Sequence, residues 1–516
     1  MYNLESVTRK LFVLGATSQY FAYFVGIATS VITVPVYLHF LGQDTYGLYV
    51  TLSSIVSYFI LFDVGIGFSV PKYVAEYSAK DEKENLESML STFLLAYLII
   101  FVLALVAGIA IAPGISKLLR MPDDLIQAGR LALIILAANF GILMVGGLYT
   151  SIFTGMRRVY IRNLFSVGQT VVIAVLSIIV LWLGGGMVGI CIVMASVSLI
   201  QLAVAFLLVR RQYSDIRIKP RLAEWSMLRE VAFPTLNYFI IQVISLVVLS
   251  TDNIVIGAFI GVGAVAPYSI AFRFCRYFTS AVGIPTTVLY PFFSDWYARG
   301  KLEELRRNHR RLMKLTTILA VLIAIFTVFF GPMIIKLWVG NENYVGNSTL
   351  YIFCIIIVTS LIVQVSATLL AGIGKHAPIA YLGLLEAAMN LVLSIIFVRY
   401  WGVFGVALAT VIAGLPTNLW FAPWYTCRIL EDSFLSLVVR EIAPAIISGS
   451  LAIAVNFLLV TYVLPDRVPA NVITGVFCCC LYLVVVRLFL KKEELMWLYG
   501  IVKSAFRMFK YSKESK

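Results

Sequence analysis

The chain has 516 residues, of which 61% are hydrophobic and 13% are charged, and its formal net charge is +14 at pH 7. Soluble proteins carry about 25% charged residues, so this chain has too few charges to cover a water-facing surface and is predicted to be a polytopic membrane protein. Its basic residues are dispersed over many short segments, which argues against nucleic-acid binding.

Apolar stretches long enough to cross a membrane occur fourteen times along the chain, since about 20 apolar residues span the hydrocarbon core. The predicted spans are 11–39, 46–71, 89–112, 127–153, 164–184, 186–209, 231–258, 264–291, 313–338, 348–372, 378–399, 402–425, 442–463 and 470–490. Gly184-Gly185-Gly186 forms the tightest predicted turn. The expected fold class is therefore an all-α polytopic membrane protein.

Lysine and arginine are distributed unevenly between the two sides of this topology. With the N-terminus in the cytoplasm, the inside segments hold 32 of these residues and the outside loops hold four. Cytoplasmic loops carry an excess of Lys and Arg, so we expect a multi-pass protein of the cell membrane with both termini cytoplasmic. Membrane lipids are expected partners, because basic segments attract anionic head groups.

Residues 36–86 align without a gap on residues 255–305, at an offset of 219 residues and with nine identities. The aligned pairs include Gly42 and Gly261, Tyr49 and Tyr268, Glu76 and Asp295, and Lys80 and Arg299. Six predicted spans separate the two copies, so the halves share one orientation and are parallel repeats. Such repeats are a usual architecture of carriers that alternate their access between the two sides of a membrane.

The repeat predicts two six-helix lobes followed by an appended helix pair. The expected divisions are an N-terminal lobe over 1–209, a cytoplasmic linker over 210–230, a C-terminal lobe over 231–426, helices 13 and 14 within 427–490, and a basic cytoplasmic tail over 491–516. Segments 210–230 and 292–314 are rich in Arg and Lys and are expected to be helical connectors.

Several classes of chemistry find no support in the sequence. The longest outside loop, 113–126, has no room for the catalytic domain that membrane glycosyltransferases and polymerases usually carry, and no phosphate-binding P-loop is present. The seven cysteines avoid the outside loops and the three histidines are scattered, so neither a disulfide framework nor a metal site is indicated. We therefore expect a transporter without cofactor or metal, not an enzyme.

Arg273 and Arg276 lie three residues apart in predicted span eight, near the middle of the membrane. Spaced in this way they share one helical face, and a central arginine costs about 2.5–3.5 kcal/mol to insert. The pair is expected to face a watery central cleft and to bind an anionic head group, because guanidinium groups match phosphate oxygens. The repeat places Ser54 and Ser57 at the equivalent positions. The alternative is a buried ion pair with Asp63 or Asp252.

Three acidic residues inside spans are candidates for a gate or for ion coupling, because intramembrane charges are costly. They are Asp63 in span two, Asp252 in span seven and Glu386 in span eleven. Asp63 fits a salt-bridge gate, a proton or cation site, or a helix cap beside Gly65 and Gly67. Asp252 fits an interfacial cap or an outer-gate partner better than a coupling site, and Glu386 stands alone.

Lys72, Arg157, Arg158 and Arg162 lie at predicted inner mouths of the bundle. They are candidates to attract an anionic head group. The same residues are also what the positive-inside rule alone would place there, so both interpretations stay open.

Two stretches resemble the polysaccharide and O-antigen flippases of the MATE-like multidrug/oligosaccharidyl-lipid/polysaccharide exporter superfamily. The first runs from Leu41-Gly42 through Tyr46-Gly47 and Tyr49 to Phe62-Asp63-Val64-Gly65 and Lys72-Tyr73-Val74-Ala75-Glu76-Tyr77, and the second runs from Thr251-Asp252-Asn253 through Gly261 to Tyr268 and Arg273. They are similar to the family's pattern LG..YG.Y, LDLG.G and R..AEY, with Lys72 in place of the usual Arg.

The resemblance implies a V-shaped pair of lobes that moves an oligosaccharide on a polyprenyl pyrophosphate from the cytoplasmic to the outer leaflet. Cell-surface polysaccharide biosynthesis would be the process served, with glycan polymerase or assembly proteins as candidate partners. An exporter of organic cations from the same superfamily is the alternative, although it would have twelve spans and buried carboxylates without buried arginines. A non-transporting scaffold of glycan assembly also stays open.

Overall fold

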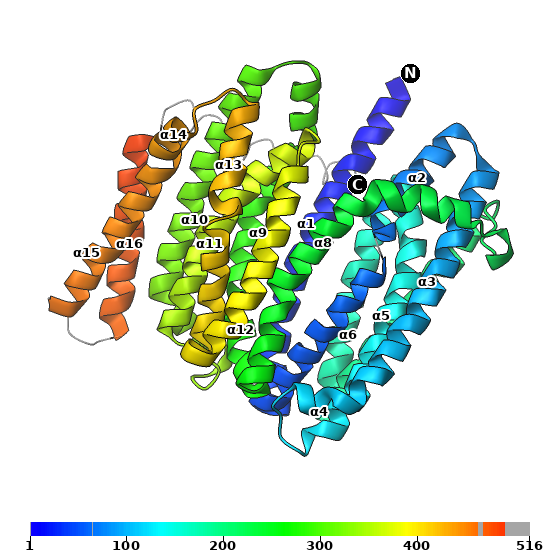
Figure 1. The fold of residues 1–516 in the computed structure, drawn as a ribbon, viewed down its shortest axis with the longest axis horizontal. Coiled ribbons are helices and arrows are strands. Elements are labelled where there is room, and N and C mark those ends of the chain that lie inside the picture. Colours follow the sequence, from blue (N-terminus) through cyan, green and yellow to red (C-terminus); the bar gives the residue numbers. More distant parts are fainter. Residues whose placement is uncertain (1, 64, 463–467, 491–516) are drawn as a thin grey trace. The chain divides into compact units, whose positions relative to one another are not determined.

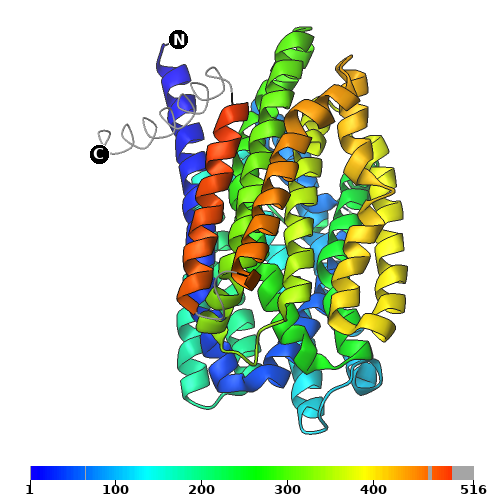
Figure 2. The ribbon, with the colours of Figure 1, turned by 90° about the vertical axis from the view of Figure 1, so that its left-hand side faces the viewer.

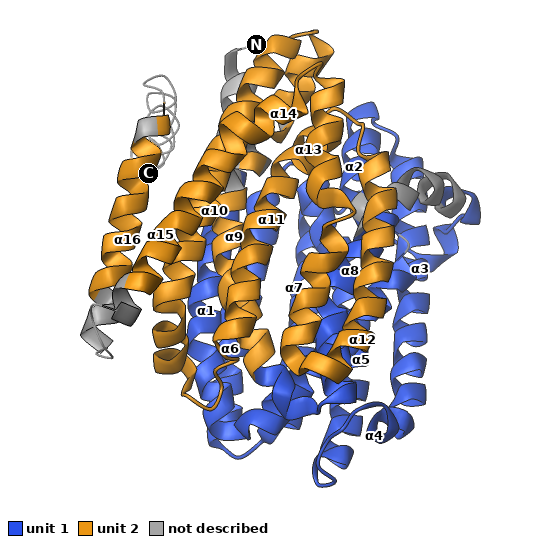
Figure 3. Ribbon diagram, turned by 60° about the vertical axis from the view of Figure 1, so that its left-hand side comes forward, with its two compact units in different colours: residues 1–266 blue, residues 267–516 orange. Residues whose placement is uncertain are grey.

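The computed structural model describes residues 2–63, 65–462 and 468–490, and these residues are helical nearly throughout (Figure 1). The chain divides into two compact units, Met1–Ala266 and Pro267–Lys516, which Figure 3 shows in different colours. Each unit has its own apolar core: Phe93 and Phe153 are fully buried in unit one, and Phe293 and Leu369 are fully buried in unit two.

Unit one contains α1 (Tyr2–Ser57), η1 (Tyr58–Asp63), α2 (Ile66–Lys80), α3 (Lys83–Ile111), η2 (Ala112–Gly114), α4 (Ile115–Leu118), α5 (Leu125–Gly155), α6 (Val159–Trp182), α7 (Gly186–Gln212), η3 (Pro220–Leu222) and α8 (Trp225–Phe259). The helix α9 (Val262–Ala298) begins in unit one and continues into unit two. Unit two also contains α10 (Leu302–Val339), α11 (Asn347–Gly372), α12 (Ala377–Gly414), α13 (Asn418–Ile429), α14 (Phe434–Leu437), the π-helix η4 (Val438–Ile442), α15 (Ala443–Tyr462) and α16 (Val468–Phe489).

Ten stretches within the described residues are long and apolar enough to cross a membrane. Two of these stretches contain a break, because Gly42 in α1 (φ 75°) and Gly402 in α12 (φ 57°) have non-helical backbone angles. The breaks divide each stretch into two crossings, and α9, with 37 residues, and α16, with 22, are long enough to cross as well. The predicted all-α polytopic fold is confirmed, and the described residues hold ten to fourteen apolar segments of membrane-crossing length.

The internal repeat is visible in the geometry of equivalent turns. Helix α3 begins at Lys83 and α10 begins at Leu302, which is the offset of 219 residues found in the sequence. Both helices follow a residue with positive φ, namely Asp81 (57°) and Gly300 (68°). An i, i+4 ion pair of 2.8 Å precedes each turn, Lys80–Glu76 in unit one and Arg299–Asp295 in unit two. The same local structure therefore follows the second span of each repeat.

The segment 210–230 is not the helical connector that its charge predicted. Helix α7 ends at Gln212, and between it and α8 only the short 3₁₀ turn η3 interrupts an irregular chain. Side chains of α3 instead accept hydrogen bonds from the backbone N–H groups of this chain: Glu87 from Arg217, Ser91 from Lys219 and Thr92 from Glu224. The linker is irregular because α3 satisfies its backbone from outside, whereas the predicted helical connector at 292–314 does consist of the end of α9 and the start of α10.

Helix α8 packs against α1, α2 and α3 and groups with unit one. The boundary between the compact units, at Ala266 and Pro267, therefore lies C-terminal to the linker that the sequence analysis used to divide the lobes. Gly47 of α1 packs against the start of α9, since a Cβ atom there would lie 1.9 Å from the carbonyl oxygen of Val262. Only a glycine permits this approach.

Candidate functional site

The two span-eight arginines lie on the central part of α9. Between them Phe274 and Cys275 are buried, whereas Arg273 is half-buried and Arg276 is exposed. The guanidinium carbon of Arg276 lies 6.0 Å from the centroid of the Phe272 ring, which is a cation–π contact. One face of α9 thus packs into unit two, and the arginines lie on the rest of the helix surface.

The serines at the equivalent positions of the first repeat are held by local hydrogen bonds. Ser54 is buried in α1 and accepts a hydrogen bond of 3.0 Å from the amide nitrogen of Asn253 on α8. Ser57 donates to the carbonyl oxygen of Ser53 at 2.8 Å. The Ser54 hydroxyl thus ties α1 to α8 and the Ser57 hydroxyl binds its own helix, which is a different arrangement from the exposed guanidinium of Arg276.

Asp252 is buried in α8 among polar contacts to α1 and η1. Its neighbour Thr251 shares a short hydrogen bond with the hydroxyl of Tyr58, and its other neighbour Asn253 binds Ser54. The structure therefore places Asp252 where two helices of unit one are joined by polar side chains.

Asp63 has the contacts of a helix cap. Its side chain is buried, and both carboxylate oxygens lie 3.2 Å from the backbone nitrogen of Gly67 in the first turn of α2. The hydroxyl of Tyr97 on α3 also hydrogen-bonds to this carboxyl group. A negative charge at a helix N-terminus is stabilising, so the contacts favour the cap among the three predicted roles.

Glu386 lies beside a break in the last span of the second repeat. Helix α12 ends at Gly414, α13 begins at Asn418, and Pro416 lies between them. The carboxylate of Glu386 accepts hydrogen bonds from the hydroxyl of Thr417 at 2.9 Å and from the amide nitrogen of Asn418 at 3.0 Å. The acidic residue therefore does not stand alone, because the start of α13 presents two buried polar side chains to it.

A row of polar residues continues from Glu386 along α12. Asn390 and Ser394 follow at successive intervals of four residues and are buried, and Asn390 donates to the hydroxyl of Thr410 at 2.8 Å. Two buried oxygens in this row, Oδ1 of Asn390 and Oγ of Ser394, and Oδ1 of Asn418 at the start of α13 have no hydrogen-bond partner among the described residues. Carboxylate, amide and hydroxyl oxygens are the donors that hard cations take. The row has the chemistry of a cation or proton site, although no cluster of His, Cys, Asp and Glu in the described ranges fits a metal ion.

The basic residues at the predicted inner mouth of unit one lie on α2 and in the turn after α5, and these two helices pack against each other. A Cβ atom on Gly155, at the end of α5, would lie 2.5 Å from Val74 of α2. Lys72 is exposed on α2, Arg157 is exposed in the turn after α5, and Arg158 donates to the side-chain oxygen of Gln212 at 2.7 Å.

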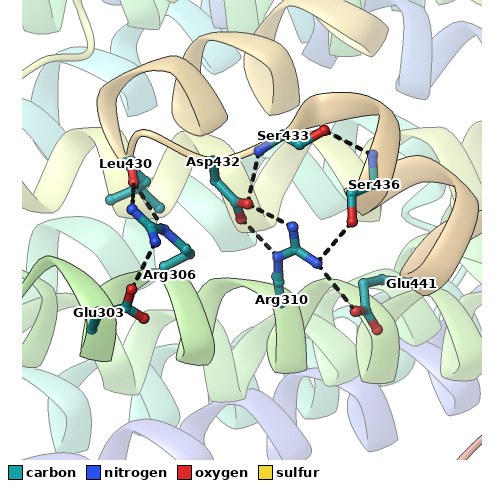
Figure 4. A network of polar contacts seen from close by, with 8 residues as sticks. All are labelled: Glu303, Arg306, Arg310, Leu430, Asp432, Ser433, Ser436 and Glu441. Atoms are coloured by element: carbon teal, nitrogen blue, oxygen red, sulfur yellow. Dashed lines mark hydrogen bonds and ion pairs between the residues drawn. The ribbon is translucent and has the colours of Figure 1, made fainter.

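An ion-pair network at one end of unit two was not anticipated from the sequence (Figure 4). Arg310 of α10 binds both carboxylate oxygens of Asp432, with distances of 2.7 Å and 2.5 Å, and also reaches Ser436 at 3.2 Å and Glu441 at 3.8 Å. Arg306 donates twice to the carbonyl oxygen of Leu430. The turn between α13 and α14 is thereby fixed on α10. Counting Lys and Arg on each side of the membrane does not reveal this contact, because the count uses each arginine only as a signal of topology.

Asp432 is ionised in this network. Burial favours its neutral form, but the hydrogen bonds from Arg310 and from the backbone N–H of Ser433, together with the charge of Arg310, hold the pKa of this carboxyl below its usual value. The pair is bidentate, which is the stronger geometry for guanidinium and carboxylate.

Comparison with known proteins agrees with this architecture. Residues 12–296 match the profile of the family described as polysaccharide biosynthesis protein, and residues 235–396 match the MatE profile. The chain is 22% identical over 490 residues to the uncharacterized membrane protein EpsK of Bacillus subtilis (strain 168), covering 91% of this chain and 94% of EpsK. It is also 22% identical over 449 residues to the uncharacterized membrane protein MJ1068 of Methanocaldococcus jannaschii, covering 82% of this chain and 85% of that protein.

Among solved structures, the lipid II flippase MurJ in an inward closed conformation superposes with a TM-score of 0.71 at 16% identity, covering 92% of this chain and 98% of MurJ. An inward-facing multidrug resistance MATE family transporter of the MOP superfamily superposes with a TM-score of 0.63 at 17% identity, covering 79% of this chain and 98% of that chain. These likenesses concern the fold. The family match covers more than half of the chain, and the chain therefore belongs to the polysaccharide biosynthesis protein family.

Proposed function

We propose that the protein is a flippase that moves a polyprenyl-pyrophosphate-linked oligosaccharide from the cytoplasmic to the outer leaflet for cell-surface polysaccharide biosynthesis. Its membership of the polysaccharide biosynthesis protein family supports this cargo class. The observation that carries the proposal is the pair of arginines on α9, of which Arg276 is exposed within a membrane-crossing helix. Two guanidinium groups at that depth lower the cost of a pyrophosphate there.

The membrane potential acts in the direction of this transport. Moving one negative charge outward is favoured by about 2.3 kcal/mol per 100 mV when the cell interior is negative. The transported head group would first meet the basic residues at the inner mouth, Lys72, Arg157 and Arg158, and then the α9 pair. Alternation of access would proceed by rocking of the two lobes, as in other transporters built from repeats.

The experiment is a leaflet-access assay in proteoliposomes. A fluorescent polyprenyl-pyrophosphate oligosaccharide is placed in both leaflets, and a membrane-impermeant quencher is added outside. The wild-type protein is expected to expose nearly all of the fluorophore, whereas Arg273→Ala with Arg276→Ala leaves the inner half protected. Arg130→Ala is the matched control, because Arg130 lies near a helix end and donates to the carbonyl oxygen of Pro113. Equal exposure by wild-type and double variant would overturn the role of the pair.

Coupling of this transport to a cation is proposed at Glu386. Asn418 binds the carboxylate of Glu386 at a helix break, and the buried oxygens of Asn390 and Ser394 follow along α12; transporters place ion sites at such breaks. Flipping by the wild-type protein is then expected to respond to an imposed sodium or proton gradient, and Glu386→Gln to lose that response. If the gradient has no effect on either protein, the coupling role is refuted while the flippase assignment stands.

A cation-coupled exporter of organic cations is the second candidate. The MatE match over 235–396 and the hydrogen-bonded carboxylate of Glu386 favour it. Uptake of a fluorescent organic cation into inverted vesicles discriminates the two functions, because a flippase of anionic lipid is expected to give no gradient-driven uptake.

A further inference from the structure

A cavity of about 1030 Å³ lies wholly within unit two, between α10, α11 and α15. Its volume is that of a ligand site. Most of its lining is apolar, including Val328, Phe329 and Ile453, and polar groups lie toward the end of the bundle where α10 meets α11. The ion-pair network around Arg310 lies at the other end of α10.

Helix α15 approaches α10 closely beside the cavity. A Cβ atom on Gly449 would lie 2.2 Å from Val321, so the two helices touch at this position. Farther along, α15 leans away from α10 (Figure 1), and Figure 2 shows α15 and α16 on the side of unit two next to α10. A wedge opens between the helices as they diverge.

The wedge faces the membrane rather than water. Leu337 and Phe457 line it and are 77% and 70% exposed, respectively. Both belong to helices long and apolar enough to cross the bilayer. Large apolar side chains that are exposed in this way are covered by lipid chains in a membrane, so the occupant must enter from the bilayer.

Two polar side chains distinguish this wedge from an ordinary gap between helices. Asn456 is fully buried and lines the cavity, and the thiol of Cys478 on α16, a weak hydrogen-bonding group, is the one partner that the described residues give its amide. A buried amide whose hydrogen bonds are only partly made costs up to about 1–3 kcal/mol, a cost that a ligand with acceptor oxygens lowers.

Lys336 supplies a positive charge at the polar end of the cavity. Its ammonium group lies 4.9 Å from the centroid of the Tyr344 ring, and no carboxylate in the described part of unit two forms an ion pair with it. The nearby Glu342 accepts a hydrogen bond from Asn343. The predicted outer side of this chain has few basic residues, so a lysine at the rim of a lipid-facing cavity is not explained by the positive-inside rule.

We propose that this cavity binds one anionic glycerophospholipid. Its phosphate lies against the ammonium of Lys336. Its ester oxygens accept hydrogen bonds from the amide of Asn456, and its head group donates a hydrogen bond to the same amide. Its acyl chains fill the apolar part of the cavity between α10 and α15. With the predicted orientation, the site belongs to the outer leaflet. The lipid completes the packing between the second repeat and the appended helices α15 and α16. This inference rests on the cavity and does not depend on which cargo is transported.

Native mass spectrometry of the full-length protein, released from nanodiscs that contain equal amounts of phosphatidylglycerol and phosphatidylcholine, tests the site. The wild-type protein is expected to retain one phosphatidylglycerol in preference to phosphatidylcholine. Lys336→Gln is expected to weaken this retention about fivefold, the effect of one basic residue near a membrane surface, and Asn456→Leu to weaken it for both lipids. Lys117→Gln is the matched control, since Lys117 is an exposed lysine on the same predicted side and away from the cavity.

Ile453→Trp fills the cavity without removing a polar group and is expected to release the bound lipid while the protein remains monodisperse. The proposal is overturned if Lys336→Gln and Ile453→Trp both retain phosphatidylglycerol as the wild-type protein does. It is also overturned if added polyprenyl pyrophosphate displaces phosphatidylglycerol one for one, because the cavity would then belong to the cargo. Loss of flipping activity in the Arg273 and Arg276 variants bears only on the cargo and leaves this result unchanged.

Discussion

Arg276 and Glu386 illustrate the two ways in which a membrane helix carries a charge. The guanidinium of Arg276 is exposed on α9 and contacts the ring of Phe272. The backbone carbonyl oxygen of Arg276 accepts a hydrogen bond from the hydroxyl of Thr279. Glu386 instead receives hydrogen bonds from Thr417 and Asn418 at a helix break. An exposed cation is available to a passing anion, whereas a solvated carboxylate inside the bundle is suited to hold a small cation.

The first prediction concerns the geometry of the arginine forks. Replacing Arg273 and Arg276 by Lys keeps the charge but removes bidentate binding to phosphate, so flipping is expected to fall by about tenfold, equivalent to about 1.4 kcal/mol. Replacement by Ala is expected to abolish flipping. Initial rates in the proteoliposome assay measure both effects, and wild-type rates in the lysine variant would show that charge alone suffices.

A second prediction separates the polar row on α12 from general packing. Ser394→Ala removes a buried hydroxyl that has no hydrogen-bond partner among the described residues and leaves the volume nearly unchanged. The thermal stability is expected to stay the same or rise, because an unsatisfied buried group is costly. The cation concentration that gives half-maximal flipping is expected to increase. An unaltered cation dependence would remove Ser394 from the site.

At the scale of helices, close approaches and short turns determine how unit one is assembled. Gly42 breaks α1 so that the first two spans connect directly, and Gly47 lets the second of these spans touch the start of α9. Both glycines belong to the stretch that resembles the polysaccharide flippases. Their presence in that stretch is explained by backbone geometry rather than by contact with cargo.

The third prediction uses this contact. Gly47→Ala places a Cβ atom 1.9 Å from the carbonyl oxygen of Val262, which forces α1 and α9 apart, and is expected to lower the melting temperature in detergent by several degrees. Gly168→Ala in α6 is the control, because no heavy atom lies within 4 Å of its added Cβ. That control is expected to be neutral or to stabilise by about 0.5–1 kcal/mol. Similar melting temperatures for both variants would contradict the packing argument.

The fourth prediction concerns the anchor of the turn between α13 and α14. Asp432→Asn removes the bidentate carboxylate partner of the half-buried Arg310 and leaves it the more distant Glu441. It is expected to cost about 2 kcal/mol, the range for hydrogen bonds to charged groups. Glu303→Gln removes an ion pair whose carboxylate is 83% exposed, so it is expected to cost less than about 1 kcal/mol. Chemical denaturation in detergent compares the two, and a larger loss for the exposed pair would refute the anchor.

The contribution of Asp432 to stability is also expected to depend on pH. The pKa of Asp432 is held below its usual value in the folded protein, so its contribution is fully present above the unfolded pKa of about 3.9. That contribution is lost as the pH falls through the lower folded pKa. The stability difference between the wild-type protein and Asp432→Asn should accordingly be constant from neutral pH down to about pH 4 and should shrink below it.

At the scale of the whole molecule, the duplication describes the repeated local structure, whereas the charge distribution predicts the orientation in the membrane. The repeat appears in the matched turns at Asp81 and Gly300 and in the matched ion pairs before them. The orientation in the membrane rests on the excess of Lys and Arg in alternate loops.

The fifth prediction tests this orientation by cysteine labelling. In a cysteine-free background, Asn341→Cys lies in a predicted outside loop and Lys375→Cys lies in a predicted inside turn, and both positions are exposed. An impermeant maleimide is expected to label the first in intact cells and the second only after lysis. The reverse pattern would invert the topology and would place the Lys336 cavity in the inner leaflet.

The sequence by itself determined the fold class and the duplication, because insertion into lipid requires long apolar segments and the repeat keeps its turn residues in register. The helical linker it predicted was wrong, since side chains of α3 bind the backbone of that segment.

Only the tertiary structure decided the surroundings of the charged residues. It placed Asp63 at the start of α2, Thr417 and Asn418 around Glu386, and Asp432 on Arg310. The sequence positions of these partners differ by up to 122 residues, and no local periodicity encodes such distant pairs. Packing brings them together because a charge inside a membrane bundle is tolerated only where other helices supply its hydrogen bonds.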